Sequence, residues 1–202
     1  MDHTQHRRDR MLDTTFATTR PVLTPVPGGA PLSLRPVAPA PGPAGLLAGA
    51  RVLVPGGLRR VEALRPGDAV LTADHGIQTV RGIHTHMLGG RDDNAPVFIA
   101  AGMVGNGANL LVAPGHRFVI RGDWVQRRLG VNEALVPARQ LIDGTGIFRS
   151  PRAEVTYYQI RFDRHELIFA EAALCESLRP QAEAPARPVL AAETPQPMRI
   201  AV

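Results

Sequence analysis

Proline and glycine interrupt this chain so often that long helices are excluded from most of its length. The 202 residues include 20 glycines and 19 prolines, and both residue types break helices and favour turns. Short apolar runs of Val, Leu, Ile and Ala stand between them. Aromatic residues make up only 4% of the chain although hydrophobic residues make up 44%. The pattern predicts an all-β domain of short strands around an aliphatic core.

The distribution of proline predicts three regions. Residues 1–44 and residues 180–202 carry proline repeatedly among small residues. Repeated proline blocks both helices and strand pairing, so we expect two flexible or extended tails. Residues 45–179 remain as the folded part, which has a usual size for one domain.

Within this domain the same order of elements occurs twice. Each half contains a strand, a turn, a strand, a short helix and a further strand, which predicts two pseudo-symmetric β subunits. In the second half we expect residues 118–120 and 124–126 to form a tight hairpin, followed by a short helix at 133–141.

One stretch, LLVAPGHRFVI at residues 110–120, combines two apolar runs with a corner. Pro114 and Gly115 favour a sharp bend, and His116 follows directly. A histidine at a corner between two buried strands is a candidate for chemistry, because turns on a rigid scaffold often carry function. The alternative is a histidine that only hydrogen-bonds the backbone of the turn.

Charge and composition exclude several partner classes. The formal net charge is +5, every cationic side chain other than histidine is arginine, and no run of arginines is longer than two residues. A nucleic-acid surface would need a basic patch or stripe, so we expect no nucleic-acid partner. No run is long enough to span a membrane, and the N-terminus lacks the apolar region of a Sec-type signal peptide. These features predict a cytoplasmic protein or export by a non-classical route.

Metal and disulfide chemistry have little support in the sequence. Cys175 is the only cysteine, so a disulfide within the chain is impossible. His84 and His86 would face the same way on a strand and could share a metal ion. No third ligand is found near them, so an exposed polar strand face is the preferred interpretation. We expect no metal site and no cofactor.

Three blocks of the domain carry a family pattern. They are GLLAGARVLVPGG with VEALRPGDAVLT in residues 45–72, LLVAPGHRFVI in residues 110–120, and YYQIRFDRHELIFAEAALCESL in residues 157–178. Together they resemble the Hint domain, the Hedgehog/intein autoprocessing module, and in particular its stand-alone bacterial branch. The blocks follow one another in the family's order, which makes the resemblance more specific than a single motif.

The resemblance implies a horseshoe-shaped all-β fold whose substrate is its own chain. In the family a leading Cys attacks the preceding carbonyl carbon and converts the peptide into a thioester, which leads to self-cleavage or protein splicing. A histidine in the second block polarises or protonates the scissile amide. By this resemblance His116 is the matching histidine, and Asp163 and His165 match polar positions of the third block.

The sequence departs from the family where the chemistry begins. Gly45 stands at the position of the leading Cys, and no Ser, Thr or Cys occurs between Ser33 and Thr72. Ala113 replaces the threonine of the second block, so the hydroxyl that would orient the scissile amide is missing. The third block has Ala172 where the family has glycine. The expectation is a Hint fold that has lost self-cleavage.

Three functional hypotheses follow. The first is an inactive Hint domain that acts as a scaffold or interaction module for an unknown protein partner. The second is an active self-cleaving protein with an unusual nucleophile, either Cys175 or water, assisted by His116 and by Asp163 or His165. The third is an adhesion- or secretion-associated β module that binds a partner.

Overall fold

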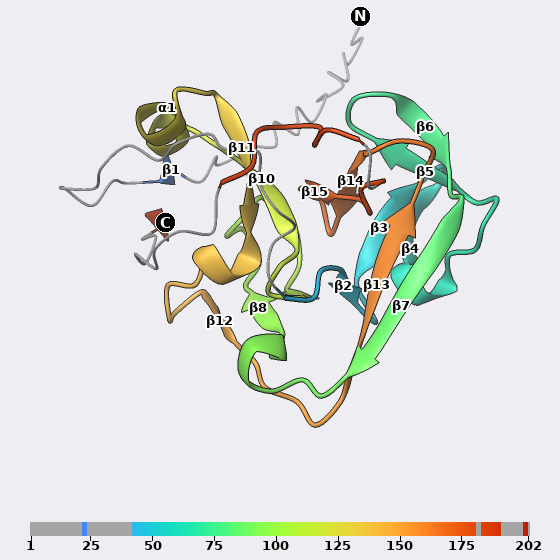
Figure 1. The fold of residues 1–202 in the computed structure, drawn as a ribbon, viewed down its shortest axis with the longest axis horizontal. Helices are drawn as coiled ribbons and strands as arrows, with labels where there is room; N and C mark the ends of the chain where they lie inside the picture. The colour runs from blue at the N-terminus through green and yellow to red at the C-terminus, as the bar shows by residue number, and fades with distance from the viewer. Residues whose placement is uncertain (1–21, 24–41, 181–182, 191–199, 202) are drawn as a thin grey trace, which may run out of the picture.

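The computed structural model describes residues 22–23, 42–180, 183–190 and 200–201, and its elements are almost entirely strands (Figure 1). They form two large antiparallel sheets and a two-stranded pair of β1 (Val22–Leu23) with β16 (Ile200–Ala201). The prediction of an all-β fold is confirmed. Most of the predicted N-terminal tail lies outside the described residues.

The first sheet has six strands in the spatial order β12-β8-β9-β2-β13-β7. These strands are β2 (Leu46–Leu47), β7 (Gly82–Leu88), β8 (Val97–Ile99), β9 (Leu110–Val112), β12 (Ile147–Arg149) and β13 (Val155–Arg161). β13 pairs with β2 on one side and with β7 on the other. Its β-branched and tyrosine side chains suit a strand that is packed on both faces.

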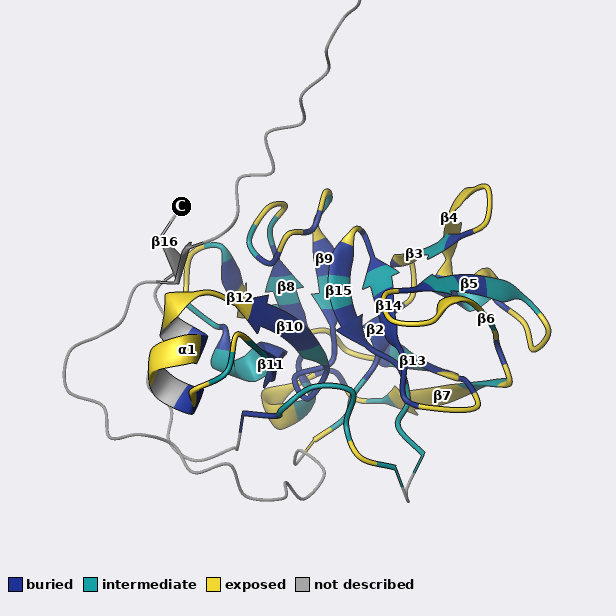
Figure 2. Cartoon of the chain, turned by 90° about the horizontal axis from the view of Figure 1, so that it is seen from above, coloured by how far each residue is buried: buried dark blue, intermediate teal, exposed yellow. Residues whose placement is uncertain are grey.

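The second sheet has eight strands, with β11-β10-β15-β14-β3-β4 in spatial order, β5 paired with β14 and β6 paired with β5. The strands are β3 (Arg51–Val54), β4 (Gly57–Arg60), β5 (Ala69–Thr72), β6 (Gly76–Thr79), β10 (Arg117–Arg121), β11 (Glu133–Pro137), β14 (Leu167–Ala170) and β15 (Ala173–Glu176). Figure 2 shows buried strands in the middle of the molecule and exposed β4, β6 and β7 toward one end.

The corner between β9 and β10 carries the chain from the first sheet to the second. The turn is closed by His116, whose N–H donates to the carbonyl of Ala113 at 3.0 Å. Gly115 donates its N–H to the carbonyl of Pro43 at 2.9 Å, and a Cβ at position 115 would lie only 2.7 Å from that oxygen. Glycine is therefore needed where the segment before β2 passes close to the corner.

The short helices correct one sequence-based prediction. They are α1 (Asp123–Leu129), η1 (Val61–Ala63), η2 (Asp92–Asn94) and η3 (Ala138–Gln140). The expected hairpin of residues 118–120 with 124–126 is wrong, because α1 occupies the second segment. Asp123 lies in the first turn of α1, and Gly130 closes it in the left-handed conformation with an N–H bond to Gln126. Both residues favour a helix at these positions.

The expected helix at residues 133–141 is also wrong over most of its length. β11 pairs with β10 along five residues, from Glu133 opposite Arg121 to Pro137 opposite Arg117. Its residues 134–137 are all buried, which fits a strand covered on both faces. Only η3 is helical in this segment. No helix among the described residues has the length and apolarity needed to cross a membrane.

One continuous hydrophobic core joins the two sheets. Its main cluster includes Ile99 and Leu110 from the first sheet and Val52, Phe118 and Ile168 from the second. These side chains are between 0% and 2% exposed. Two smaller apolar clusters lie beside it, one with residues of the first sheet and one with residues of the second, so the polar groups at the junction are held in a rigid apolar surrounding.

Residues 183–190, in the segment predicted as a flexible tail, pack against β11. Leu135 donates its N–H to the carbonyl of Pro188 at 2.7 Å and accepts a hydrogen bond from the N–H of Leu190 at 2.9 Å. Val189 and Leu190 are buried. This part of the chain adds a short parallel stretch beside β11.

Candidate functional site

Gly45 lies directly before β2 in a conformation that only glycine adopts readily. Its φ is +131°, in the region that strains any residue with a Cβ. A Cβ built there would lie 2.8 Å from the carbonyl oxygen of Tyr158 and 3.2 Å from Cγ of Gln159. Two independent constraints, the backbone angle and the neighbouring strand β13, therefore disfavour a side chain at position 45.

Ala113 is held beside Gly45 by the backbone. The N–H of Ala113 donates to the carbonyl oxygen of Gly45 at 2.9 Å. Ala113 is fully buried in an apolar cluster with Leu47, Val155 and Tyr157. The fold thus brings together Gly45 and Ala113, two of the three positions at which we expect the sequence to depart from the family pattern.

His116 is a buried and neutral imidazole. Its residue is only 4% exposed, and its Nε2 has no hydrogen-bond partner among the described residues. The ring meets Phe118 edge to face, with centroids 5.5 Å apart. Burial lowers the pKa of His116 to about 4, although the negative charge of Glu176 acts in the opposite direction. At neutral pH this histidine can therefore accept or donate a proton but carries no charge.

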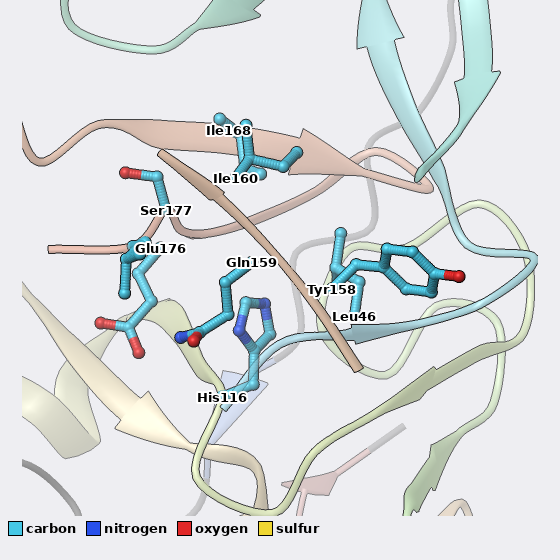
Figure 3. Close-up of a pocket in the computed structure, with 9 residues that line it drawn as sticks. Leu46, His116, Tyr158, Gln159, Ile160, Ile168, Glu176 and Ser177 are labelled. Atoms are coloured by element: carbon cyan, nitrogen blue, oxygen red, sulfur yellow. The ribbon is translucent and has the colours of Figure 1, made fainter. Parts of the chain in front are cut away.

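A small cavity lies beside His116 (Figure 3). Its volume is about 10 Å³, at the lower limit of the space that one water molecule needs. The residues that line it come from β2, the corner, β13, β14 and the end of β15: Leu46, His116, Tyr158, Gln159, Ile160, Ile168, Glu176, Ser177 and Leu178. The cavity therefore lies between His116 and β13, the strand that crowds Gly45.

Glu176 is the buried anion of this site. Nη1 of Arg117 donates to both of its carboxylate oxygens, at 3.1 and 3.0 Å. Burial alone would raise the pKa of Glu176, but His165 and Arg117 outweigh it and hold the pKa below its usual range. The carboxylate is therefore ionised at neutral pH and paired with a cation, as a buried charge requires.

His165 lies on the other side of Glu176. Its Nδ1 accepts a hydrogen bond from the N–H of Ala186 at 2.8 Å, so the neutral ring carries its proton on Nε2. Nε2 lies 3.7 Å from the Oε2 atom of Glu176, too far for a hydrogen bond but close enough for electrostatic attraction. His165 thus belongs to the buried polar cluster around Glu176.

Two predicted site residues lie elsewhere. Asp163 is exposed and forms a two-pronged ion pair with Arg81. Cys175 is fully buried in β15, opposite Phe118 and Ile168. Burial raises the pKa of its thiol well above the usual range. Neither residue lines the cavity.

Sequence reasoning missed Glu176 and its partner Arg117. Both stand next to buried strand residues, but charged residues at strand ends are mostly exposed, so their position alone does not indicate a buried ion pair. The pairing itself depends on two segments that are 59 residues apart. It therefore could not be found from local pattern.

Comparison with models of protein families finds a match over most of the described residues. The Hint domain family model matches residues 44–182. No curated protein matches the chain. Among solved structures, a bacterial intein-like domain from Clostridium thermocellum is similar, with 14% identity and a TM-score of 0.44 over 66% of this chain and 98% of that domain.

Two inteins are similar to a comparable degree. The gp41-1 intein has 13% identity and a TM-score of 0.41, over 66% of this chain and 98% of the intein. The MchDnaB-1 intein has 13% identity and a TM-score of 0.43, over 66% of this chain and 99% of the intein. Because the family model covers both large sheets and the buried polar cluster, more than half of the sequence, the chain belongs to the Hint domain family.

Proposed function

We propose that this Hint domain keeps the family's fold and its buried histidine but does not cleave its own chain. In this role the domain is a scaffold or interaction module for an unidentified protein partner. The proposal rests above all on Gly45. A self-cleaving domain of this family needs a nucleophilic side chain at that position, and here there is neither a side chain nor space for one.

Cys175 is a poor replacement for the missing nucleophile. A thiol attacks as a thiolate, and the raised pKa of Cys175 keeps it protonated. Its side chain is enclosed in the core and lies outside the cavity beside His116. These features argue against the hypothesis of a cysteine-initiated reaction from this position.

Hydrolysis by water is the second candidate function. The cavity beside His116 is at the lower limit of the space that one water molecule needs, and the neutral imidazole can accept a proton from water. This route would cleave the chain without a thioester and therefore without any response to added thiol.

The test is the intact mass of freshly purified full-length protein, followed over a day at neutral pH with and without a thiol. Our proposal predicts an unchanged mass in both samples. A fragment that begins at Gly45 would contradict it. Cleavage that ignores the thiol and disappears in His116→Ala would favour hydrolysis. Cleavage that disappears in Cys175→Ala would assign the reaction to the buried thiol.

A further inference from the structure

The edge strand β7 presents two histidines on one face. His84 and His86 are two residues apart, so their side chains leave the strand in the same direction. Both are exposed, and neither imidazole forms a hydrogen bond or ion pair with any described residue. Their imidazoles are thus free to act as ligands.

The position of β7 leaves these rings open to solution. It is the last strand of the six-stranded sheet and pairs only with β13, where His84 lies opposite Gln159 and His86 opposite Tyr157. Figure 2 shows β7 as exposed at the margin of the molecule. An ion can approach from the unpaired side without displacing any part of the fold.

We propose that His84 and His86 form a two-nitrogen binding site for a divalent transition-metal ion of the copper, nickel and zinc class. Imidazole nitrogen is a preferred ligand of these ions, and water completes their coordination. The described residues contain no group of three or more potential metal-binding side chains, so this part of the chain supplies two ligands only. The site is therefore open and is distinct from the cavity beside His116.

The surrounding charges favour a site of moderate strength. Arg161 lies opposite Gly82, two residues before His84, and its Nε would be 3.3 Å from a Cβ at position 82. This cation lies on the side of His84 away from His86. The positive charge of Arg161 weakens the attraction between this site and a divalent ion. The affinity must therefore come from both imidazoles binding the same ion.

The experiment titrates the full chain with Cu²⁺ and measures affinity and stoichiometry by calorimetry, with the ligand nitrogens counted by electron paramagnetic resonance. The parent carries His3→Ala and His6→Ala, because these two histidines lie outside the described residues. We expect one bound ion with two nitrogen ligands. Either His84→Ala or His86→Ala lowers the affinity about tenfold or more, because the second imidazole binds intramolecularly.

Two controls make the result specific to the face of β7. His75→Ala leaves the affinity unchanged, because Nδ1 of His75 is engaged by Glu166 at 2.9 Å. Adding Thr85→His to His84→Ala keeps the number of histidines but places the new ring on the opposite face, so the affinity stays low. Absence of binding in the parent, an unchanged affinity in the single variants, or full recovery with Thr85→His would overturn the proposal.

Discussion

At the scale of single residues, our proposal of an inactive domain depends on Gly45. Its backbone has a φ of +131°, a conformation that strains any residue with a side chain. A Cβ at this position would lie 2.8 Å from the carbonyl oxygen of Tyr158. We therefore expect that a side chain at position 45 would require movement of β2 against β13.

The first prediction concerns substitution at Gly45. Gly45→Ala should lower the free energy of unfolding more than Gly49→Ala does, as measured by urea denaturation. Both glycines have positive φ, but a Cβ at Gly49 meets nothing within 4 Å. Gly49→Ala should cost about 1 kcal/mol for backbone strain, and Gly45→Ala about 2 kcal/mol more because of the clash. Equal losses of unfolding free energy in the two variants would show that β13 moves aside at no cost, and they would contradict the predicted clash.

The corresponding cysteine variant tests the site directly. Gly45→Cys should destabilise the domain to a similar extent and should leave the chain uncleaved, because the strained backbone and the missing hydroxyl at Ala113 both remain. Efficient thiol-sensitive cleavage in this variant would mean that the site adapts to a nucleophile.

His116 gives a prediction about pH. Its pKa falls from 6.5 to about 4 on folding, so the unfolded chain takes up the proton first as the pH decreases. The contribution of neutral His116 to the free energy of unfolding is fully present above pH 6.5, and it is lost as the pH falls to about 4. The low pKa of Glu176 acts in the same direction on acidification. The loss due to His116 amounts to about 3 kcal/mol.

The measurement is the free energy of unfolding between pH 6.5 and pH 4. In His116→Gln the decline over this range should be smaller than in the parent by about 3 kcal/mol, whatever the absolute stability of the variant. His84→Gln, on the exposed face of β7, serves as the control and should follow the parent curve. If the unfolding free energies of His116→Gln and the parent fell in parallel with decreasing pH, the prediction of a buried neutral histidine would be wrong.

At the scale of secondary structure, the hairpin of β14 and β15 has a tight turn at residue 172, where the resemblance predicts glycine. Two residues join the strands, and both have positive φ, +47° at Glu171 and +72° at Ala172. Such two-residue turns favour glycine. Glu171 is stabilised in this conformation by Arg51, whose backbone N–H and guanidinium both donate to its carboxylate.

Ala172→Gly should therefore stabilise the protein. Ala172 is exposed and its carboxyl-side neighbour Ala173 pairs with Ala170, so the substitution relieves backbone strain without opening a cavity. We expect a gain of about 1 kcal/mol in the free energy of unfolding. The matched control is Ala101→Gly at an exposed turn without positive φ, which should be neutral or destabilising. A loss of stability in Ala172→Gly would argue against strain at this turn.

The elements that sequence reasoning assigned wrongly share one physical cause. α1 and β11 are short, and their local signals are weak compared with the contacts they make with β10. Residues 134–136 are apolar without alternation, and such a run suits a buried strand and a buried helix equally well. Pairing with β10 along five positions decided between them.

At the scale of the whole molecule, residues 183–190 connect parts of the chain that are distant in sequence. Arg187 forms ion pairs with Asp74, at the turn between β5 and β6, and with Glu133 in β11. The N–H of His165 donates to a carboxylate oxygen of Glu183 at 2.8 Å. This segment therefore packs over the same side of the fold as the buried cluster around Glu176.

Removing apolar contact in this segment should measure its contribution. Leu190 is 5% exposed and belongs to the main core, so Leu190→Ala should lower the free energy of unfolding by about 2–3 kcal/mol. Leu58→Ala is the control, because Leu58 is 46% exposed and should change stability by less than about 0.5 kcal/mol. Equal effects in urea denaturation would show that residues 183–190 do not stabilise the fold.

The sequence by itself determined the class of fold, the family and the absence of Ser, Thr and Cys around Gly45. Each of these depends on local composition or on the order of motifs. Glycine and proline limit helices, and LLVAPGHRFVI marks the corner between two strands. The absence of Ser, Thr and Cys from residues 34–71 is evident from the sequence alone. Only the tertiary structure decided how the site is built. The backbone of β13 leaves no space for a side chain at Gly45. Burial keeps His116 neutral, and Glu176 is paired with Arg117 from another strand. These properties arise from contacts between segments that are far apart in the chain, where burial and charge depend on packing and cannot be inferred from local pattern.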